Sequence, residues 1–242
     1  MQIIPRPSPN FGPRRAGSRI DLVVLHYTAM ETAEAALQRL CDPAIEVSSH
    51  YLIARNGAVF QLVDEAQRAW HAGAGCWGNV NDVNSHSIGI ELCNLGPLAN
   101  LPPFPAAQMK ALTVLLADIR ARHAIPSARV IGHSDLAPSR KADPGPAFDW
   151  QRLSRAGQSI WVPSAPGSGA DPQAGPPSWP RFLRAARLFG YGTDVAKADL
   201  LQAFRLRFAP MRLGQPLQQA DIAQIEALSA TYPCIDGASN SA

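Results

Sequence analysis

Two histidines and one aspartate in this sequence stand where they could hold a metal ion together. His26 lies at the end of the apolar run DLVVLHY, His133 ends the apolar run RVIGH, and Asp143 follows ten residues later in a proline-rich loop. Neighbouring strand ends in a sheet can bring side chains 107 positions apart into contact. Two imidazoles and one carboxylate leave the fourth position of a tetrahedral ion open, which is the pattern of catalytic zinc. A single histidine at a strand end is more often a half-buried polar residue, so the prediction depends on all three together.

Two further ionisable residues could complete a hydrolytic site. Pro144 favours an extended Asp143, and in an extended stretch Lys141 points to the same side as Asp143. An ammonium group there could stabilise an oxyanion, although most lysines are solvated surface residues. Glu91 lies in SIGIEL, where alternation places it on the face of the strand opposite the isoleucines. Beside a water bound to zinc, Glu91 would be a general base; the alternative is a structural ion pair.

The strands that must position these residues are visible as β-rich runs. They lie at residues 21–27, 50–63, 87–92 and 129–133. The second run contains Asn56-Gly57, the strongest short signal for a hairpin. The sequence therefore predicts strands that end at or beside the candidate site residues.

Helical patterns alternate with these strands. Residues 28–40 carry apolar residues at helical spacing, and Thr28 with Glu31 matches a capping box. A longer helix is predicted from Pro105 to about His123. Strands mixed with helices predict an α/β (α+β) fold with a central mixed β-sheet flanked by helices.

The last third of the chain reads as a linker followed by a small helical module. Nine of the eighteen residues from Pro163 to Pro180 are proline or glycine, a composition that builds no core. Three short helical patterns follow, in a segment of roughly 60 residues, near the lower size limit for independent folding. The sequence predicts a main domain over 1–162, a linker over 163–178 and a helical domain over 179–242.

Composition limits the class of protein. The chain has 242 residues, of which 46% are hydrophobic and 17% charged, as in a globular protein with a substantial core. A net charge of +3 falls short of the signature of a nucleic-acid-binding protein. No apolar run approaches the roughly 18 residues of a membrane span, and the first residues match no export signal. The expected compartment is the cytoplasm, with the four cysteines reduced.

Five blocks of sequence resemble one known family. VVLHYTA, SSHYLIARNGAVFQLV, RAWHAG, SIGIEL and GHSDLAPSRKADPGPAFDW occur in the order found in the zinc-dependent N-acetylmuramoyl-L-alanine amidases of the AmpD/AmiD type. The similarity covers about residues 18–155. The C-terminal segment is similar to the helical peptidoglycan-binding domain fused to some members, and the alternative is a packing appendage without a ligand.

The resemblance implies a role for each candidate residue. The zinc ligands would be His26, His133 and Asp143. Glu91 would be the catalytic carboxylate, Lys141 the stabiliser of the tetrahedral intermediate, and His71 of RAWHAG a wall of the substrate groove. His50, His86 and His123 are expected to be structural.

The implied activity is hydrolysis of the amide between the muramyl lactyl group and L-alanine of the stem peptide. Muropeptides, including 1,6-anhydro forms, would be the ligands, with no nucleic acid and no obligate protein partner. A non-catalytic peptidoglycan-recognition protein is the alternative. Likeness to a wall-binding domain favours the periplasm or cell envelope, against the cytoplasmic expectation.

Overall fold

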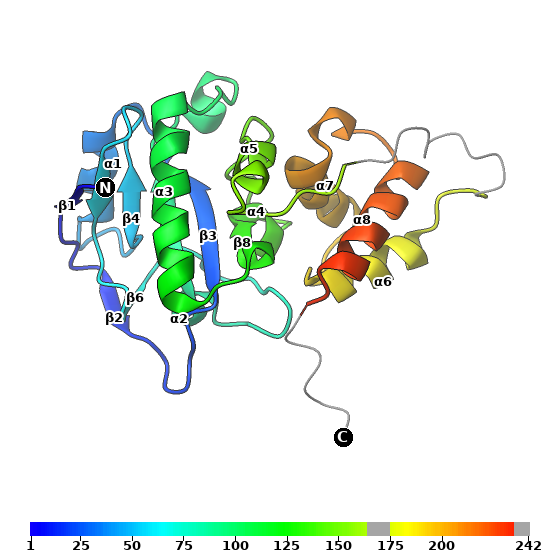
Figure 1. Ribbon diagram of the computed structural model, residues 1–242, viewed down its shortest axis with the longest axis horizontal. Coiled ribbons are helices and arrows are strands. Elements are labelled where there is room, and N and C mark those ends of the chain that lie inside the picture. The colour runs from blue at the N-terminus through cyan, green and yellow to red at the C-terminus, as the bar shows by residue number, and fades with distance from the viewer. Residues whose placement is uncertain (164–174, 235–242) are drawn as a thin grey trace.

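Figure 1 shows the computed structural model, in which helices pack on both faces of a central six-stranded sheet. The structure describes residues 1–163 and 175–234. Along the sheet, the strands are β1 (Ile3–Pro5), β5 (Val59–Gln61), β4 (Tyr51–Ile53), β7 (Ser87–Leu92), β3 (Leu22–Tyr27) and β8 (Val130–Gly132). Only β4 and β5 pair antiparallel; the other neighbours are parallel. The predicted α/β fold with a central mixed sheet is confirmed.

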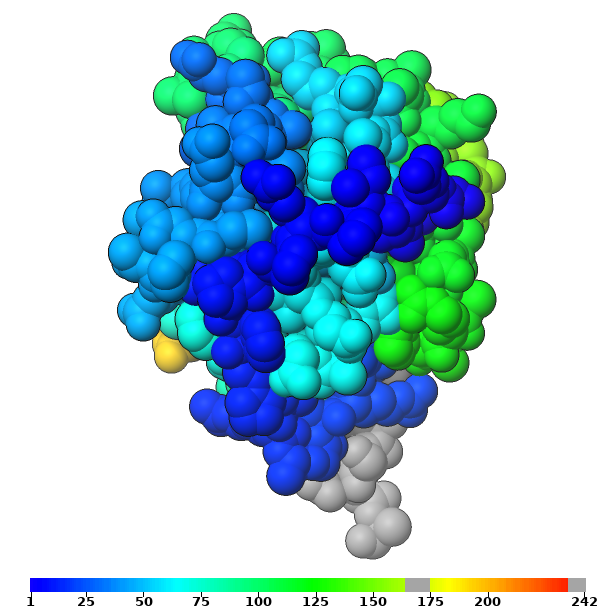
Figure 2. Space-filling view, turned by 90° about the vertical axis from the view of Figure 1, so that its left-hand side faces the viewer, coloured from blue at the N-terminus to red at the C-terminus, as the bar shows by residue number. Residues whose placement is uncertain are grey.

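Three short strands were not expected from the sequence. β1 extends the main sheet, while β2 (Phe11–Pro13) pairs antiparallel with β6 (Gln67–Ala69) in a separate ribbon. In Figure 2 the N-terminal segment, in dark blue, runs across the side of the molecule that lies at the left of Figure 1. Each strand has only three residues and two of them contain proline, so periodicity gives no signal for them.

One face of the sheet is covered by α3 (Ala106–His123), the long helix that the sequence predicted. Apolar residues of this helix such as Leu112 and Leu116 share a cluster with Val23 and Leu25 of β3. Because side chains alternate along a strand, the residues between them point to the opposite face. His26 therefore belongs to the face that α3 does not cover.

The helix predicted over 28–40 begins later than expected. α1 spans Ala33–Leu40, and Thr32 is its N-cap, with a side-chain oxygen that accepts a backbone N–H of the first turn. The predicted capping box of Thr28 and Glu31 is wrong. Ala29 has a φ of 50°, and a left-handed residue ends any helical path before Thr32.

The hairpin predicted at Asn56-Gly57 is confirmed. It joins β4 to β5, and the amide of Gly57 donates to Ala54 O at 2.9 Å. Gly57 has a φ of +89°, and a Cβ there would lie 2.9 Å from Ala107 O of α3. The position therefore needs glycine for both conformation and space.

The C-terminal segment forms the three predicted helices, which lie on the side of the molecule where β8 is the edge strand of the sheet (Figure 1). They are α6 (Trp179–Phe189), α7 (Lys197–Phe208) and α8 (Gln219–Thr231). One hydrophobic cluster contains Phe182 and Phe204 of these helices together with Val24 of β3. The boundaries 1–162 and 179–242 stay predictions, and residues 164–174 of the predicted linker lie outside the described residues.

The remaining helices are short and join these elements. They are α2 (Val83–His86), α4 (His133–Leu136) and α5 (Trp150–Arg155), with 3-10 turns at Gly96–Ala99, Ser127–Arg129 and Pro210–Arg212. Within residues 1–163 and 175–234, no helix has the length and apolarity that a bilayer crossing requires.

Candidate active site

The parallel pairing of β3 with β8 brings the two predicted histidines together. Leu25 is level with Gly132, so His26 on β3 and His133 at the start of α4 both follow directly at the same edge of the sheet. Their Nδ1 atoms are 2.9 Å apart, and each lies 3.0 Å from Oδ2 of Asp143. All three side chains are buried. The structure thus brings the three predicted metal ligands to one point.

Asp143 reaches this point because its loop folds back onto β8 and α4. The amide of Ser134 donates to Asp143 O at 2.9 Å. A Cβ on Gly132 would lie 2.8 Å from Pro144 Cδ, so only glycine lets the loop approach this closely. The peptide bond between Asp143 and Pro144 is cis. Glycine in β8 therefore has a direct role in placing the carboxylate.

The hydrogen-bond network assigns the proton of His133. Its Nε2 lies 2.9 Å from Ala72 O, a carbonyl that can only accept, so Nε2 carries the hydrogen. A neutral imidazole protonated at Nε2 has a lone pair at Nδ1. The nitrogen that faces His26 and Asp143 is therefore free to bind a cation.

A chain of hydrogen bonds assigns the same tautomer to His26. The Ser87 hydroxyl donates to Val83 O at 2.6 Å, so it must accept from His71 Nε2, 3.2 Å away. His71 then has its lone pair on Nδ1, which lies 3.0 Å from His26 Nε2 and accepts from it. Burial lowers the pKa of His71 well below the usual value and that of His26 to about 4, so both rings are neutral. His26 Nδ1, like His133 Nδ1, therefore carries a lone pair and no proton.

This donor set fits a divalent metal ion. Two imidazole nitrogens and a carboxylate oxygen point at one another with no proton left to join the two nitrogens. Although burial opposes ionisation, the close contacts with His133 and His26 hold the pKa of Asp143 well below its usual value. Atoms about 3 Å apart leave a point about 2 Å from all three, the length of zinc bonds to nitrogen and oxygen. The same ligands also suit other transition metals.

Glu91 lies next to this cluster on β7, level with His26 of β3. Burial, with a contribution from the Asp143 charge, raises the pKa of Glu91 to about 8. Its Oε2 is buried and has no hydrogen-bond partner among the described residues. A carboxyl group without a structural partner beside a cation site is available to move protons. The structural ion pair considered as an alternative for Glu91 is absent among the same residues.

All six predicted site residues line one cavity of about 480 Å³. They are His26, His71, Glu91, His133, Lys141 and Asp143. Lys141 is exposed at the rim, while His71 is half-buried behind His26. The geometry thus brings the predicted residues together, and the role of each one stays a prediction.

Two of the remaining histidines that were predicted to be structural make hydrogen bonds away from the candidate metal site. His50 is buried, accepts from the amide of Gly89 and lies 3.2 Å from Gln67 O. His123 contacts the carboxylate of Glu65 at 2.6 Å. Neither lines the cavity of the candidate metal site.

Two contributors to the site were missed at the level of sequence. Ser87 fixes the proton of His71, but a serine at the start of a strand carries no distinguishing signal. Arg140 lines the cavity beside Lys141, and its guanidinium donates to Ala74 O. Its position next to Lys141 in the loop was the one available signal for it.

A candidate mononuclear metal site with a free carboxyl group, at the carboxyl edge of a mixed sheet, defines the class as a hydrolase with a metal-binding centre. The chain belongs to the N-acetylmuramoyl-L-alanine amidase family, whose model matches residues 16–146. It is of the AmpD/AmiD type, as the resemblance predicted.

The relatives differ in how much of the chain they cover. Over 236 residues the chain is 36% identical to N-acetylmuramoyl-L-alanine amidase AmiD of Escherichia coli (strain K12), covering 88% of this chain and 84% of that protein. A structure of AmiD in complex with the substrate anhydro-N-acetylmuramic acid-L-Ala-D-gamma-Glu-L-Lys has a TM-score of 0.79 at 35% identity and covers 90% of this chain and 92% of that one.

Two further relatives complete the comparison. AmpDh3 of Pseudomonas aeruginosa, in complex with anhydromuramic pentapeptide, has a TM-score of 0.81 at 33% identity, over 91% of this chain and 95% of that one. The 1,6-anhydro-N-acetylmuramyl-L-alanine amidase AmpD of Haemophilus influenzae (strain ATCC 51907 / DSM 11121 / KW20 / Rd) is 36% identical over 60% of this chain and 86% of its own length. The similarity to AmiD and AmpDh3 therefore extends over more of this chain than the similarity to AmpD.

Proposed function

We propose that this protein is a zinc-dependent amidase that cleaves the bond between the muramyl lactyl group and L-alanine of muropeptides, including 1,6-anhydro forms. The three proton-free atoms of His26, His133 and Asp143 carry the proposal, because such a cluster is stable only around a cation. The ligands of AmiD and AmpDh3, and the name of AmpD, support an anhydro-muropeptide as substrate.

In the proposed site, His26, His133 and Asp143 hold the ion. When bound, zinc supplies Lewis acidity, which polarises an amide carbonyl and makes water more acidic. The hydrogen bond from His133 Nε2 to Ala72 O and the one from His26 Nε2 to His71 orient the rings, as outer partners of metal ligands do.

Glu91 is the proposed proton carrier. It removes a proton from the attacking water as the water oxygen bonds to the lactyl carbonyl carbon, and it delivers this proton to the alanine nitrogen as the C–N bond breaks. The products are a lactyl carboxylate and a stem peptide with a free amino group. A nearby dication favours the ionised carboxylate, which offsets the effect of burial on the pKa of Glu91.

Lys141 is the proposed stabiliser of the oxyanion. Its ammonium lies at the rim of the same cavity, and its charge acts on both His26 and Glu91. A cation in this place stabilises negative charge that develops on the carbonyl oxygen. His71 is proposed to form part of the cavity wall as well as to orient His26.

The test is metal content together with product analysis. The purified protein should contain one zinc per chain and release free stem peptide from an anhydro-muropeptide; chelation should stop the release and zinc should restore it. A protein that binds the muropeptide without releasing peptide would be the recognition protein considered as the alternative. Reconstitution with cobalt, nickel or manganese tests the choice of zinc.

The compartment and the size of the substrate remain linked proposals. We propose a cytoplasmic enzyme acting on soluble fragments, with a C-terminal segment of the peptidoglycan-binding type. Turnover of an anhydro-muropeptide should then exceed turnover of intact sacculi, and fractionation should recover the native protein in the cytoplasm. Preference for sacculi and recovery from the envelope would favour the periplasmic alternative.

A further inference from the structure

Asp135 is a buried carboxylate on α4, the single helical turn that begins with His133. Its Oδ2 accepts from the amide of Gly132 at 2.8 Å and so caps the start of the turn. A helix of one turn has no stability of its own, so its position depends on caps and on packing. Asp135 is therefore a point at which the position of α4 can be set.

Two of the three proposed metal ligands depend on α4. His133 is its first residue, and the amide of Ser134 holds the carbonyl of Asp143 at 2.9 Å. A shift of this turn would move His133 and the backbone of Asp143 together, while His26 stays on β3. The distances of 2.9 and 3.0 Å between the donor atoms therefore require α4 to be fixed.

The remaining partners of Asp135 come from the C-terminal segment. The hydroxyl of Tyr191, which follows α6, donates to Oδ1 at 2.6 Å. Arg207 of α7 donates from Nη1 to Oδ2 at 2.9 Å. Its second terminal nitrogen donates to Val130 O on the edge strand at 3.0 Å, and its guanidinium stacks 4.5 Å from the centre of the Trp150 ring. Tyr191 and Arg207 thus hold the strand and the turn that carry His133.

We propose that Tyr191 and Arg207 are positioning residues of the metal site, acting through Asp135 and α4. The C-terminal helices then have a role in assembling the site, whether or not they also bind peptidoglycan. The inference rests on the proposed metal site. It assigns a specific task to a segment for which the sequence offered a peptidoglycan-binding domain or a packing appendage.

Arg205 provides a matched comparison on the same helix. It is as buried as Arg207, and its guanidinium also pairs with a buried carboxylate, Asp221. Its remaining hydrogen bonds go to Gln215 O and Pro216 O, so all of its polar contacts stay within the C-terminal segment. Loss of Arg205 tests how much the stability of the helices alone matters, whereas loss of Arg207 also removes the link to α4.

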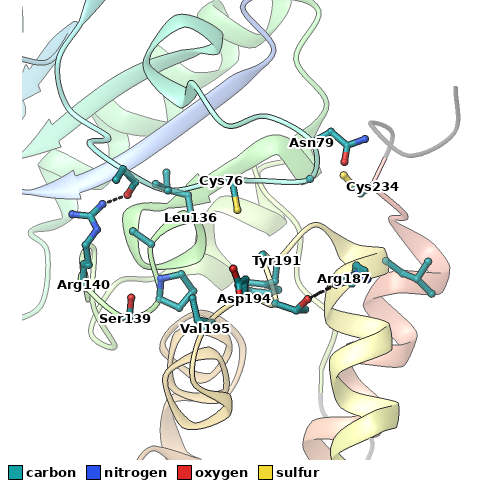
Figure 3. A pocket seen from close by; sticks show the side chains of 18 of the residues that line it. Cys76, Asn79, Leu136, Ser139, Arg140, Arg187, Tyr191, Asp194, Val195 and Cys234 are labelled. Atoms are coloured by element: carbon teal, nitrogen blue, oxygen red, sulfur yellow. Dashed lines mark hydrogen bonds between the residues drawn. The ribbon is translucent and has the colours of Figure 1, made fainter. Parts of the chain in front are cut away.

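Tyr191 and α4 border a large cavity, and the variants used in the test must leave this cavity intact. Figure 3 shows side chains that line this cavity, among them Tyr191 and Leu136 of α4. Its volume is about 790 Å³. Tyr191→Phe removes only the hydroxyl that contacts Asp135 and keeps the ring in place. An effect of this variant on metal binding would come from the lost hydrogen bond and not from a changed cavity.

The experiment compares the full chain with Tyr191→Phe, Arg207→Lys and Arg205→Lys. Zinc affinity is measured by competition with a chromophoric chelator, cobalt spectra report the ligand geometry, and urea unfolding of the metal-free proteins reports stability. Tyr191→Phe and Arg207→Lys should each weaken zinc binding about tenfold, as the loss of an outer partner does, and should change the cobalt spectrum. Arg205→Lys should unfold at lower urea but keep the affinity and spectrum of the unchanged protein.

Zinc affinities of Tyr191→Phe and Arg207→Lys equal to that of the unchanged protein would overturn the inference. So would an equal loss in Arg205→Lys, since affinity would then follow global stability. If Arg207→Lys does not fold, Tyr191→Phe decides the matter alone. Absence of zinc binding in the unchanged protein would overturn the proposed function and this inference together, and only that result does both.

Discussion

The Nδ1 atoms of His26 and His133 lie 2.9 Å apart, although 107 positions separate the two residues. Each ring donates its Nε2 hydrogen away from the other, to His71 and to Ala72 O. Two lone pairs this close repel unless a cation lies between them. The contact between the histidines is therefore the clearest single indication that these residues form a metal site.

Removal of one ligand should abolish both metal binding and turnover. His26→Ala and Asp143→Ala each leave two protein ligands, too few for a stable zinc site. Zinc content should fall well below one per chain, and release of stem peptide should fall to background. A variant that loses turnover but retains stoichiometric zinc would remove that residue from the ligand set. Elemental analysis and product chromatography make the measurement.

Glu91 should be needed for turnover and not for metal binding. Glu91→Gln keeps the shape of the side chain but cannot carry the proton, so kcat should fall about 10²–10⁴-fold. Zinc content should stay at one per chain, because Glu91 lies outside the triangle of donor atoms. Full turnover by Glu91→Gln would exclude Glu91 as the general base.

Lys141 should affect the chemical step more than binding. Lys141→Met removes the ammonium while keeping most of the side-chain length, and kcat should fall about 10²–10³-fold, as with loss of an oxyanion donor. Zinc affinity and KM should change little, because Lys141 is exposed at the rim. A rise in KM at unchanged kcat would instead assign Lys141 to substrate binding.

The position of His71 permits two roles, and substitution of this residue can distinguish them. As the partner of His26 Nε2 it orients a proposed ligand, so His71→Ala should weaken zinc binding about 10–100-fold. As a cavity wall alone, it would raise KM and leave zinc affinity unchanged. Ser87→Ala is the matched variant, since it removes only the partner of His71 Nε2. A smaller loss of zinc affinity in Ser87→Ala would support the relay of hydrogen bonds.

The free energy of unfolding should depend on pH through Glu65, which lies outside the candidate metal site. Burial alone would raise its pKa, but hydrogen bonds from Arg122, His123 and Tyr51 lower it to about 2, from a usual value of 4.5. Between these values the unfolded chain binds more protons than the folded one, so stability falls as pH falls. The loss should amount to about 2–3 kcal/mol by pH 2.

Glu65→Gln is the control for this pH dependence. Its free energy of unfolding should already be lower at pH 7, and the difference from the unchanged protein should shrink as pH falls from 4.5 toward 2. Urea unfolding at several pH values measures both curves. Parallel curves over that range would show that Glu65 has its ordinary pKa in the folded protein.

The sequence predicted the central strands and the composition of the site because both leave local patterns. Apolar runs ending in His26 and His133 and the Asn56-Gly57 turn determine neighbouring elements directly. The short strands β1, β2 and β6 are formed by tertiary pairing and have no pattern of their own.

Contacts between distant segments were not predictable in the same way. The tautomer of His26 depends on Ser87 through His71. The position of α4 depends on Arg207, which lies 72 residues after Asp135 in the sequence. The predicted division at the proline-rich stretch stays a prediction, but no pattern in the sequence indicated that Phe204 and Val24 would share one hydrophobic cluster. Composition describes a linker but gives no information on what the following helices contact.

The three-residue strand β8 forms one border of the sheet, and it is held in register by Val130, Ile131 and Gly132 against β3. A slip of β8 by one residue would reverse the faces of β8 and move His133 away from His26. An ion bound by both histidines would link β3 to β8 and would bind only when the two strands are in the native register. Supplying zinc during refolding should then favour the native alignment, and chelators should make this border the first part of the sheet to exchange its amide hydrogens.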